Sequence, residues 1–513
     1  MRKLAAILAA FLLAVPLTVQ AQDAGKTIRD AIGNLLGAQA ETGGGAAGNK
    51  ETQIENAGDA DDRIVPDSMV QVRLSFAPIV RKTAQSVVNV NAARAQQESR
   101  SPFAGDPFFE RFFGSQGFGG PQRRRNPTSL GSGVIVSEDG VILTNNHVIE
   151  NANQVKVSLS DGREFDCEIV LKDAKSDLAV LRVRDKVKLE PIAIADSDNV
   201  EVGDLVLAIG NPFGVGQTVT LGIVSAVSRS LAGINDYGYF LQTDAAINPG
   251  NSGGALVDME GRLIGINTAI YSRSGGSVGI GYAIPSNMTQ LILKSASVGA
   301  TVIRPWLGAD FQSITNEIAD SLGLKSAKGA IVTSVVSGGP ADRTGLQAGD
   351  IVVSLNGQPI ENVDGLGYRL DTAGVGNVAK LELLSRGKSR TIEIKLEAPP
   401  ETVPRDERDM PENSPLWGAK VANLSPAVAV ETGVSADKSG VIVVNVARNS
   451  LAALNGIRPG DIVREVNGEA INDSKALETI VSANSRAWQF VVERAGRIFV
   501  FERNGSLFRQ YIR

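Results

Sequence analysis

The chain is poor in the two side chains that most often build metal centres. Its 513 residues include one cysteine, Cys167, and one histidine, His147. A single cysteine excludes an intramolecular disulfide, and this pair supplies no ligand cluster, so we expect no metal and no cofactor. Cys167 lies in a strand-like alternation of apolar and polar residues, which favours a small core residue over a reactive thiol.

The sequence also lacks an excess of charge of either sign. Lys and Arg number 51 against 56 Asp and Glu, a net charge of −5, so no electrostatic feature favours binding to nucleic acid. The basic run at 123–125 is interpreted as a solvated loop.

Only the N-terminus carries a long hydrophobic run. Three residues with two positive charges precede an apolar run from Leu4 to Val15, which is too short to span a bilayer comfortably, and the small residue Ala21 follows. This pattern is typical of a cleavable secretory signal peptide over residues 1–21. It predicts an exported protein whose contact with membranes is at most peripheral.

The length predicts several domains. Residues 22–65 are rich in Gly, Ala and acidic side chains, which indicates a disordered leader with a short helix near 27–36. From residue 66 to 298, short β-branched runs between turn residues predict an all-β sandwich or barrel domain. A helix over 286–297, with Ser286 as its N-cap, is expected to close it. The expected strands are 86–90, 133–136, 141–144, 155–159, 165–171, 178–183, 204–209 and 218–227.

A phenylalanine-rich stretch interrupts this β pattern. Six of the 16 Phe residues lie between Pro102 and Gly120, in a segment broken by Gly and Pro. Such a segment forms neither a regular strand nor a long helix. Two interpretations stay open: a loop packed on its own domain, or a mobile apolar arm that docks on a neighbouring subunit.

The C-terminal part contains a repeat. Residues 345–360 align with 456–471 at an offset of 111, with 8 of 16 positions identical. The repeat predicts two tandem domains of similar fold, at 299–397 and 416–513, joined by a Pro-rich charged linker at 398–415. Each copy contains an Asn-Gly pair, a hairpin-turn signal, at Asn356-Gly357 and Asn467-Gly468.

Two local patterns point to nucleophilic catalysis. His147 lies just past the end of an expected strand, and Ser252 lies between glycines in Gly250-Asn-Ser-Gly-Gly. A nucleophilic serine needs a tight turn whose backbone N–H groups converge on the carbonyl under attack, and glycines permit that geometry. We place the oxyanion hole in the turn Gly250-Asn251-Ser252, with the N–H groups of Gly250 and Ser252 as donors.

The third member of a catalytic triad is chosen among four aspartates that follow the histidine: Asp161, Asp166, Asp173 and Asp177. Asp177 is preferred because it directly precedes a buried strand, where a carboxylate can bond the imidazole and fix its tautomer. The chain order His, Asp, Ser is that of chymotrypsin-type double barrels. An esterase or lipase also uses Gly-x-Ser-x-Gly, but there the serine comes first, so we discard this reading.

Five motifs together resemble the HtrA/Deg (Do-like) family of periplasmic serine endoproteases. They lie at 144–148, 177–181, 210–214, 242–256 and 281–285. The resemblance runs from about Ser75 to the C-terminus and implies a mainly β chain: a chymotrypsin-like double β-barrel at 66–298, followed by two α+β PDZ domains. It further implies a periplasmic enzyme that degrades unfolded or misfolded envelope proteins, forms homotrimers or larger assemblies, and also acts as a chaperone.

The resemblance also implies roles for particular segments. The Phe-rich segment, at about 98–128, corresponds to a regulatory loop that reaches into another subunit's active site. Arg229 matches a sensor-loop arginine that helps to order the oxyanion loop, and 268–283 corresponds to a specificity loop for small aliphatic P1 residues.

A PDZ domain binds exposed C-terminal peptides by adding a strand and capturing the carboxylate with backbone N–H groups. In the first repeat, Trp306-Leu307-Gly308-Ala309 fits such a loop. In the second repeat, Trp417-Gly418-Ala419 is displaced by one position, so docking or assembly is preferred there over peptide binding. We expect peptide binding to the first PDZ domain to activate the enzyme. The alternative is a chaperone or scaffold with incidental proteolysis.

Overall fold

The computed structural model describes residues 75–93, 128–150, 152–212, 216–229, 238–270, 277–297, 301–435, 437–483, 487–504 and 507–512. The predicted signal peptide, the leader with its helix at 27–36 and most of the Phe-rich loop lie outside these residues. Among the helices within these ranges, none is long and apolar enough to cross a membrane.

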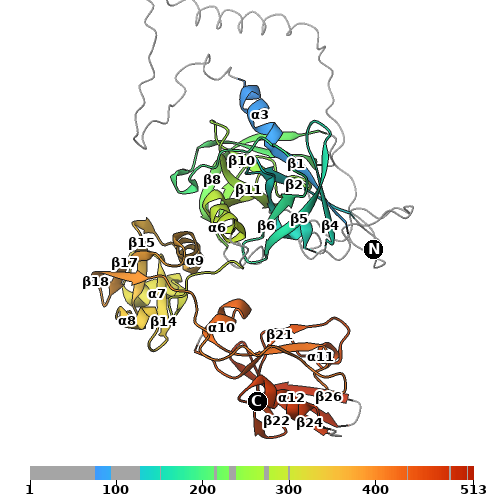
Figure 1. Cartoon of the computed structure of the whole chain (residues 1–513). Helices are drawn as coiled ribbons and strands as arrows, with labels where there is room; N and C mark the ends of the chain where they lie inside the picture. Colours follow the sequence, from blue (N-terminus) through green and yellow to red (C-terminus); the bar gives the residue numbers. More distant parts are fainter. Residues whose placement is uncertain are drawn as a thin grey trace, which may run out of the picture. The chain divides into compact units, whose positions relative to one another are not determined.

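The first half of the described chain forms two closed six-stranded barrels (Figure 1). The first barrel has the strand order β1-β2-β3-β6-β5-β4 and the second has the order β10-β11-β12-β9-β8-β7. All eight expected strands are present, and four more complete the second barrel. The strands are β1 (Val87–Ala93), β2 (Thr128–Ile135), β3 (Val141–Asn145), β4 (Gln154–Ser158), β5 (Glu164–Asp173), β6 (Leu178–Val183), β7 (Leu205–Gly210), β8 (Thr218–Arg229), β9 (Phe240–Thr243), β10 (Ala255–Val257), β11 (Leu263–Ile270) and β12 (Gly281–Pro285).

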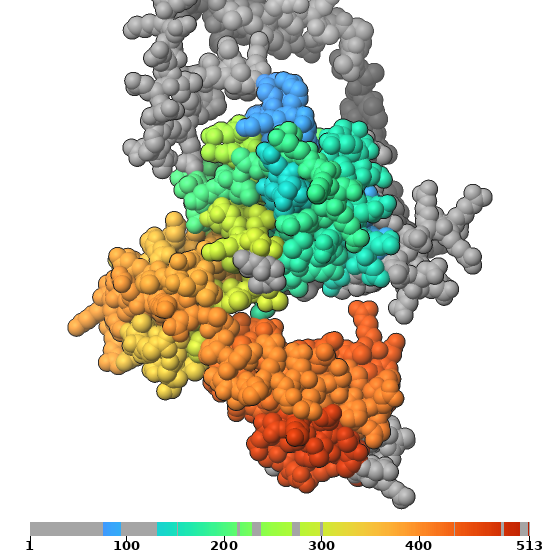
Figure 2. Space-filling model, in the orientation of Figure 1, coloured from blue at the N-terminus to red at the C-terminus, as the bar shows by residue number. Residues whose placement is uncertain are grey.

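The alternation of side chains along the strands builds three apolar cores. On β3, Ile142 belongs to the core of the first barrel, whereas its neighbour Leu143 packs in the core shared by both barrels. On β7, Ala208 fills the second barrel and Ile209 joins the shared core. Because successive strand residues point to opposite faces, one strand can serve both cores. In Figure 2 the first barrel (teal) lies directly against the second (green to yellow-green).

The closing helix has the predicted bounds, but its predicted cap is wrong. Helix α6 spans Ser286–Ser297, so Ser286 is already its first residue. The buried Ser286 hydroxyl donates to the carbonyl of Ala195, 2.6 Å away, and thereby ties the helix to the segment before β7. Four shorter helical segments of this region are α3 (Ala77–Thr83), η1 (Ala84–Ser86), α5 (Asn146–Ile149) and η2 (Ser197–Asn199).

Two PDZ domains follow the barrels. The first has the sheet order β13-β14-β15-β17-β18 and the second has β19-β20-β21-β22-β24-β25-β26. Both Asn-Gly hairpins are confirmed, since Asn356 and Asn467 have φ values of 51° and 52° and are followed by positive-φ glycines. The first domain contains β13 (Ala309–Ser313), α7 (Asn316–Leu322), β14 (Ala330–Val335), α8 (Pro340–Arg343), β15 (Ile351–Leu355), β16 (Gln358–Pro359), α9 (Val363–Ala373), β17 (Val378–Ser385) and β18 (Lys388–Lys395). The second contains β19 (Arg408–Asp409), β20 (Ala419–Asn423), α10 (Pro426–Thr432), β21 (Val441–Val446), α11 (Leu451–Leu454), β22 (Ile462–Val466), β23 (Glu469–Ala470), α12 (Ser474–Val481), β24 (Ala487–Arg494), β25 (Arg497–Asn504) and β26 (Leu507–Ile512).

The one-position displacement between the two repeats arises far from the peptide-binding loop. The N-caps of α7 and α10, Thr315 and Ser425, are 110 positions apart, whereas the first residues of β14 and β21, Ala330 and Val441, are 111 apart. The extra residue therefore lies in the turn after α10. Gly308 and Gly418 occupy the same place in their loops, because their carbonyls accept from Val336 and Ala447, at equivalent positions after β14 and β21.

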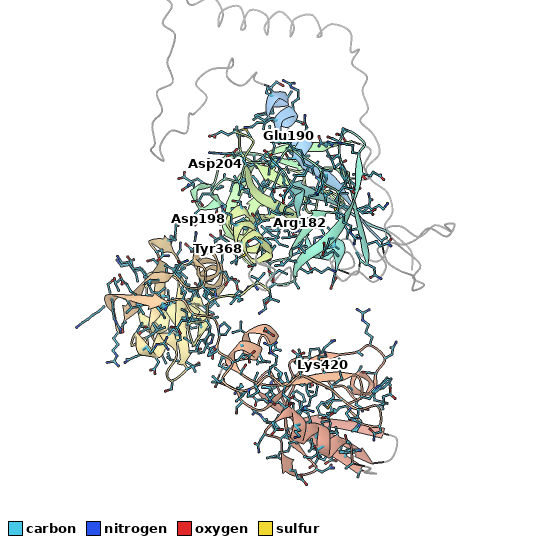
Figure 3. All side chains as sticks on the ribbon, in the orientation of Figure 1. Arg182, Glu190, Asp198, Asp204, Tyr368 and Lys420 are labelled. Carbon is cyan, nitrogen blue, oxygen red and sulfur yellow. The ribbon has the colours of Figure 1, made fainter. Side chains whose placement is uncertain are left out.

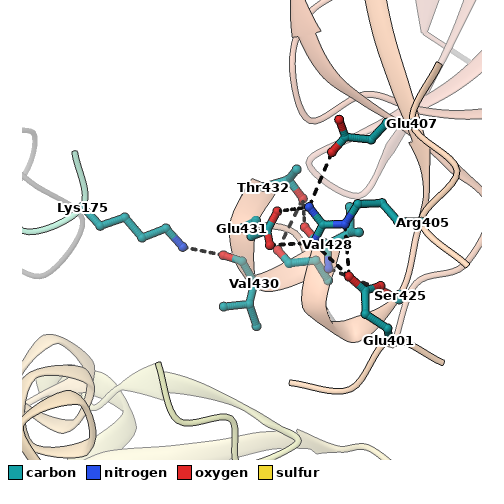
Figure 4. Close-up of polar contacts among 10 residues, drawn as sticks. Lys175, Glu401, Arg405, Glu407, Ser425, Val428, Val430, Glu431 and Thr432 are labelled. Atoms are coloured by element: carbon teal, nitrogen blue, oxygen red, sulfur yellow. Dashed lines mark hydrogen bonds and ion pairs between the residues drawn. The ribbon is translucent and has the colours of Figure 1, made fainter. Parts of the chain in front are cut away.

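Part of the predicted linker is built into the second PDZ domain. Strand β19 pairs with β20. Nearby, the Arg405 guanidinium contacts three carboxylates, of which Glu431 on α10 is held by both terminal nitrogens at 2.6 and 2.8 Å; the other two are Glu401 and Glu407 (Figure 4). A bidentate arginine pair has a defined geometry, so the linker is anchored on α10 rather than free.

Cys167 is a buried core residue on β5, as its sequence context predicts, with 5% of its surface exposed. Burial, together with the negative charge of Asp166, raises the pKa of its thiol to about 12. At pH 8 the thiolate fraction is on the order of one part in ten thousand. We therefore expect iodoacetamide to leave the folded protein unmodified and to alkylate Cys167 once urea unfolds it, as mass spectrometry would detect; rapid alkylation of the native chain would contradict this.

Candidate active site

His147 is placed by a strand that turns directly into a short helix. Strand β3 ends at Asn145, and α5 (Asn146–Ile149) carries His147 in its only turn. The imidazole Nδ1 lies 2.8 Å from Asp177 Oδ2 and 3.0 Å from Oδ1, and the main-chain N–H of His147 donates to Oδ1 at 3.0 Å. Both side chains are less than 10% exposed. The carboxylate thus holds both the ring and the backbone of the histidine.

Asp177 sits in a strained turn between β5 and β6. Its φ is 56°, in the left-handed region that aspartate and asparagine tolerate better than most residues. Its main-chain carbonyl accepts from the N–H of Asn146 and from the side-chain amide of Asn145, at 3.1 and 3.0 Å. These bonds tie the turn to the residues that precede His147, so the two members of the pair are fixed to each other through backbone as well as side chains.

Thr268, on β11, links the carboxylate to the serine. Its hydroxyl donates to Asp177 Oδ2 at 2.7 Å, and its carbonyl accepts from the Ser252 hydroxyl at 3.1 Å. Thr268 is fully buried. No local sequence pattern assigns Thr268 a catalytic role, and it falls only within the expected specificity segment at 268–283, because its contacts with Asp177 and Ser252 come from distant parts of the chain.

The loop before Ser252 is a tight turn. The N–H of Asn251 donates to the carbonyl of Asn248 at 3.0 Å, with Pro249 and Gly250 between them, and Gly250 has φ 98°. Proline followed by a positive-φ glycine is the pattern of a type II turn. Asn251, the middle residue of the predicted oxyanion turn, uses its N–H inside the turn, which leaves Gly250 and Ser252 as the two candidate donors of this prediction. In the part of the chain that the structure describes, the N–H groups of Gly250 and Ser252 have no acceptor.

The other three aspartates do not reach the histidine. Asp161 is exposed and bonds Arg163, and Asp166 is exposed and pairs with Lys156 at 3.6 Å. Asp173 is buried, and its carboxylate accepts hydrogen bonds from the main-chain N–H and the hydroxyl of Ser176.

Asp173 also joins a buried charge cluster with the first PDZ domain. Arg304 Nη2 lies 2.6 Å from Asp173 Oδ2, and Arg304 Nε lies 3.0 Å from Asp371 Oδ2 on α9. All three side chains are at most 10% exposed. Since Asp173 caps the turn that leads to Asp177, Arg304 connects α9 to the segment that carries the candidate catalytic carboxylate.

Removing this arginine takes away the guanidinium that contacts both buried carboxylates, Asp173 and Asp371. We expect Arg304→Ala to lower the free energy of unfolding by about 3–5 kcal/mol, measured by urea denaturation of the full chain. Arg343→Ala is a matched control: it removes a pair with Glu397 at 2.8 Å that is 50% and 39% exposed, so its expected cost is about 0–1 kcal/mol. Equal losses for the two variants would contradict the assignment.

A second contact joins α9 to the start of β9. The rings of Tyr239 and Tyr368 stack at 3.9 Å with an interplanar angle of 6°. The guanidinium of Arg369 lies over both rings and forms an ion pair with Asp198. The Tyr368 hydroxyl lies 3.5 Å from the Asp198 carboxylate (Figure 3). Burial raises the pKa of this hydroxyl. Tyr239 lies ten residues after Arg229, for which the family resemblance implies a sensor role. Arg229 itself ends β8 and pairs with Phe240 of β9, while its side chain lies outside the described residues.

The first PDZ loop has open backbone donors. Leu307 is buried, and Gly308 has φ 71°, with the Trp306 ring against it. Within the described ranges, the N–H groups of Leu307 and Gly308 have no acceptor. Consecutive free N–H groups at the start of an edge strand are the groups that a peptide carboxylate requires.

The second PDZ loop uses one of the two equivalent donors internally. The N–H of Trp417 donates to the Ser414 carbonyl at 3.0 Å, and that of Ala419 donates to the Leu416 carbonyl at 2.9 Å. Only the N–H of Gly418 remains without an acceptor among the described residues. The preference for docking over peptide binding in this domain therefore has a physical basis in its closed loop rather than in the displaced register.

Comparisons with known proteins identify the domains of the chain. Residues 131–266 match the trypsin-like peptidase domain, and residues 305–396 and 418–494 each match the PDZ domain. A solved structure, the HtrA-type protease AlgW with decapeptide, is 40% identical and covers 64% of this chain and 99% of its own, with a TM-score of 0.47.

Curated relatives match over most of their length. The periplasmic serine endoprotease DegP of Escherichia coli K12 is 36% identical over 446 residues, which cover 82% of this chain and 90% of DegP. A probable periplasmic serine protease do/HhoA-like of Haemophilus influenzae is 39% identical over 429 residues, covering 82% and 90%. A probable periplasmic serine endoprotease DegP-like of Chlamydia trachomatis is 38% identical over 399 residues, covering 77% and 79%. Identity at this level across both the peptidase and PDZ regions shows that the chain belongs to the DegP/HtrA family of serine endoproteases.

Proposed function

We propose that His147, Asp177 and Ser252 form the catalytic triad of this endoprotease. The observation that carries the proposal is the contact of His147 Nδ1 with both oxygens of Asp177, at 2.8 and 3.0 Å. With Nδ1–H donated to the carboxylate, Nε2 is left as the acceptor for a serine proton. The shared partner Thr268 supports the placement of Ser252 in the same site.

The chemistry is acyl transfer to Ser252. Its Oγ forms a bond to the scissile carbonyl carbon while its proton passes to His147 Nε2, and the N–H groups of Gly250 and Ser252 hold the carbonyl oxygen as it becomes negative. His147 then gives the proton to the leaving amine, and the peptide C–N bond breaks. Water, deprotonated by His147, releases the acyl group and restores Ser252.

We further propose that the substrates are unfolded or misfolded envelope polypeptides, in a periplasmic protein that forms homotrimers or larger assemblies. The first PDZ domain is the candidate site for their C-terminal ends, because the N–H groups of Leu307 and Gly308, beside the edge strand β13, have no acceptor among the residues that the structure describes. The buried contacts of Arg304 and Tyr368 give that domain a route to the active site.

A holding activity without cleavage is a second candidate. Its support is that the peptide-binding loop at Gly308 is separate from Ser252, so an unfolded chain can be bound when the nucleophile is absent. The expected result is that Ser252→Ala still slows the aggregation of a heat-denatured client, as light scattering measures. Loss of this protection in the variant would remove the chaperone proposal.

The experiment that tests the function combines labelling with proteolysis. A fluorophosphonate probe reacts with an activated serine, and peptide mapping of the adduct is expected to identify Ser252. Casein cleavage by the mature protein is expected to rise when a peptide with an apolar C-terminus is added, and to stay at its basal rate when the same peptide is amidated, because the amide removes the carboxylate. A label on another serine would refute the triad, and equal effects of both peptides would refute the PDZ-linked switch.

A further inference from the structure

The buried hydroxyl of Ser132, on β2 of the first barrel, contacts the nucleophile loop of the second barrel. Ser132 Oγ donates to the carbonyl of Gly250 at 2.6 Å, and the main-chain N–H of Ser132 donates to the carbonyl of Ser252 at 2.8 Å. Ser132 is fully buried. One residue therefore binds the loop on both sides of Asn251, from the opposite barrel.

The geometry points to Ser132 as a positioning residue for the oxyanion hole, an inference that rests on the triad and the donors proposed above. The two carbonyls that Ser132 holds belong to Gly250 and Ser252, the residues whose N–H groups are the candidate oxyanion donors. The held carbonyls lie in the peptide units 250–251 and 252–253, on either side of the unit that carries the Ser252 N–H, and the first of them directly follows the unit that carries the Gly250 N–H. Because the neighbouring units are held, rotation of the two donor units is restricted before substrate arrives. Such preorganised donors cost no reorganisation in the transition state.

Ser132 is itself fixed by a polar chain that crosses the same interface. Its Oγ accepts from the N–H of Asn211 at 2.8 Å, and the carbonyl of Asn211 accepts from the side-chain amide of Asn89 on β1 at 2.9 Å. Asn89 and Asn211 are 1% and 2% exposed. Because the Asn211 N–H occupies an acceptor position of the hydroxyl, the Ser132 proton is directed to the Gly250 carbonyl. No other hydrogen bond of Ser132 Oγ is present in the part of the chain that the structure describes.

The nucleophile loop is packed tightly at two of its glycines. A Cβ added to Gly253 would come within 2.1 Å of the Ser132 carbonyl, and one added to Gly250 would come within 2.5 Å of the Pro212 side chain. Removing the hydroxyl alone leaves the Asn211 N–H and the Gly250 carbonyl buried without their partner, a polar loss that favours rearrangement of the loop.

The test uses the full-length mature protein and three variants. Ser132→Ala removes the hydroxyl, Ser132→Cys keeps a weak donor of similar size, and Ser286→Ala is the matched control, since Ser286 is also fully buried and donates to one main-chain carbonyl, that of Ala195, at 2.6 Å. Each is assayed well below its unfolding midpoint for kcat and KM on a fluorogenic peptide. Inhibition is measured with a peptide boronate, whose tetrahedral adduct places an oxygen in the hole, and with a cleaved product peptide.

We expect Ser132→Ala to lower kcat about 10–100-fold, somewhat less than the loss of a whole donor, with little change in KM. Boronate affinity should fall by a similar factor, product affinity should stay unchanged, Ser132→Cys should be intermediate, and Ser286→Ala should match the parent. If Ser132→Ala keeps the boronate affinity of the parent, the inference is wrong. If Ser132→Ala does not fold, the boronate affinity of Ser132→Cys is compared with that of the parent instead, and an unchanged affinity would overturn the inference. Ser252→Ala separates the two levels: activity in that variant would refute the proposed function, whereas an inactive Ser252→Ala beside a normal Ser132→Ala would refute only this inference.

Discussion

Replacing Ser252 by alanine is expected to lower kcat/KM for casein-derived peptides about a millionfold, the scale seen when a serine protease loses its nucleophile. The change removes one oxygen atom, whose described bond is to the carbonyl of Thr268 at 3.1 Å. The fold and the open donors at Gly308 are not involved, so the unfolding midpoint and the affinity for C-terminal peptides should be retained.

A second variant, His147→Ala, tests whether the histidine and Ser252 act together. His147→Ala should cost about as much as Ser252→Ala, and the double variant should be no slower than either single one, because the groups of a triad act as a unit. Rates are followed by single-turnover cleavage of a fluorogenic peptide. Additive losses in the double variant would show that His147 and Ser252 do not act as a unit, and substantial activity in Ser252→Ala would show that another residue is the nucleophile.

Asp177→Asn is expected to lower kcat about 10⁴-fold with little change in the fold. Asparagine is isosteric and tolerates the φ of 56° at this position, so the turn should keep its shape. The loss comes from hydrogen-bond direction. The carboxylate accepts from the His147 main-chain N–H at Oδ1 and from the Thr268 hydroxyl at Oδ2, besides the imidazole.

An amide can supply only one acceptor in place of two. The main-chain N–H of His147 cannot accept, so the amide oxygen must take the Oδ1 position and the NH₂ group must face Nδ1 from the Oδ2 position, 2.8 Å away. Nδ1 then becomes an acceptor, the imidazole proton moves to Nε2, and Nε2 loses the lone pair that receives the serine proton.

Asp166→Asn is the matched control for this variant. Asp166 is exposed, and its pair with Lys156 is 3.6 Å long with both side chains more than half exposed. We expect its kcat, measured beside that of Asp177→Asn at the same pH, to equal that of the parent. Comparable losses in both variants, or an Asp177→Asn enzyme with nearly full kcat, would contradict the assignment of the orienting carboxylate.

The sequence alone was sufficient for eight of the twelve barrel strands, the repeat and the candidate triad. Short alternating runs between turn residues locate β1 to β8, since the period of a strand is local, and the Asn-Gly pairs locate both hairpins for the same reason. The single histidine and the glycine-flanked serine are visible because few residues can perform that chemistry. Asp177 could be preferred but not distinguished from its three neighbours by pattern alone.

Only the tertiary structure decided which backbone groups are available. Asn251 looks like its neighbours in the sequence, but its N–H is consumed by the turn to Asn248, and Trp417 and Ala419 of the second PDZ loop lose their N–H groups in the same way. Likewise, Thr268 and Ser132 act on Ser252 from strands 16 and 120 residues away in the chain. Hydrogen bonds between distant segments depend on how the barrels close and pack, and no local sequence pattern records that.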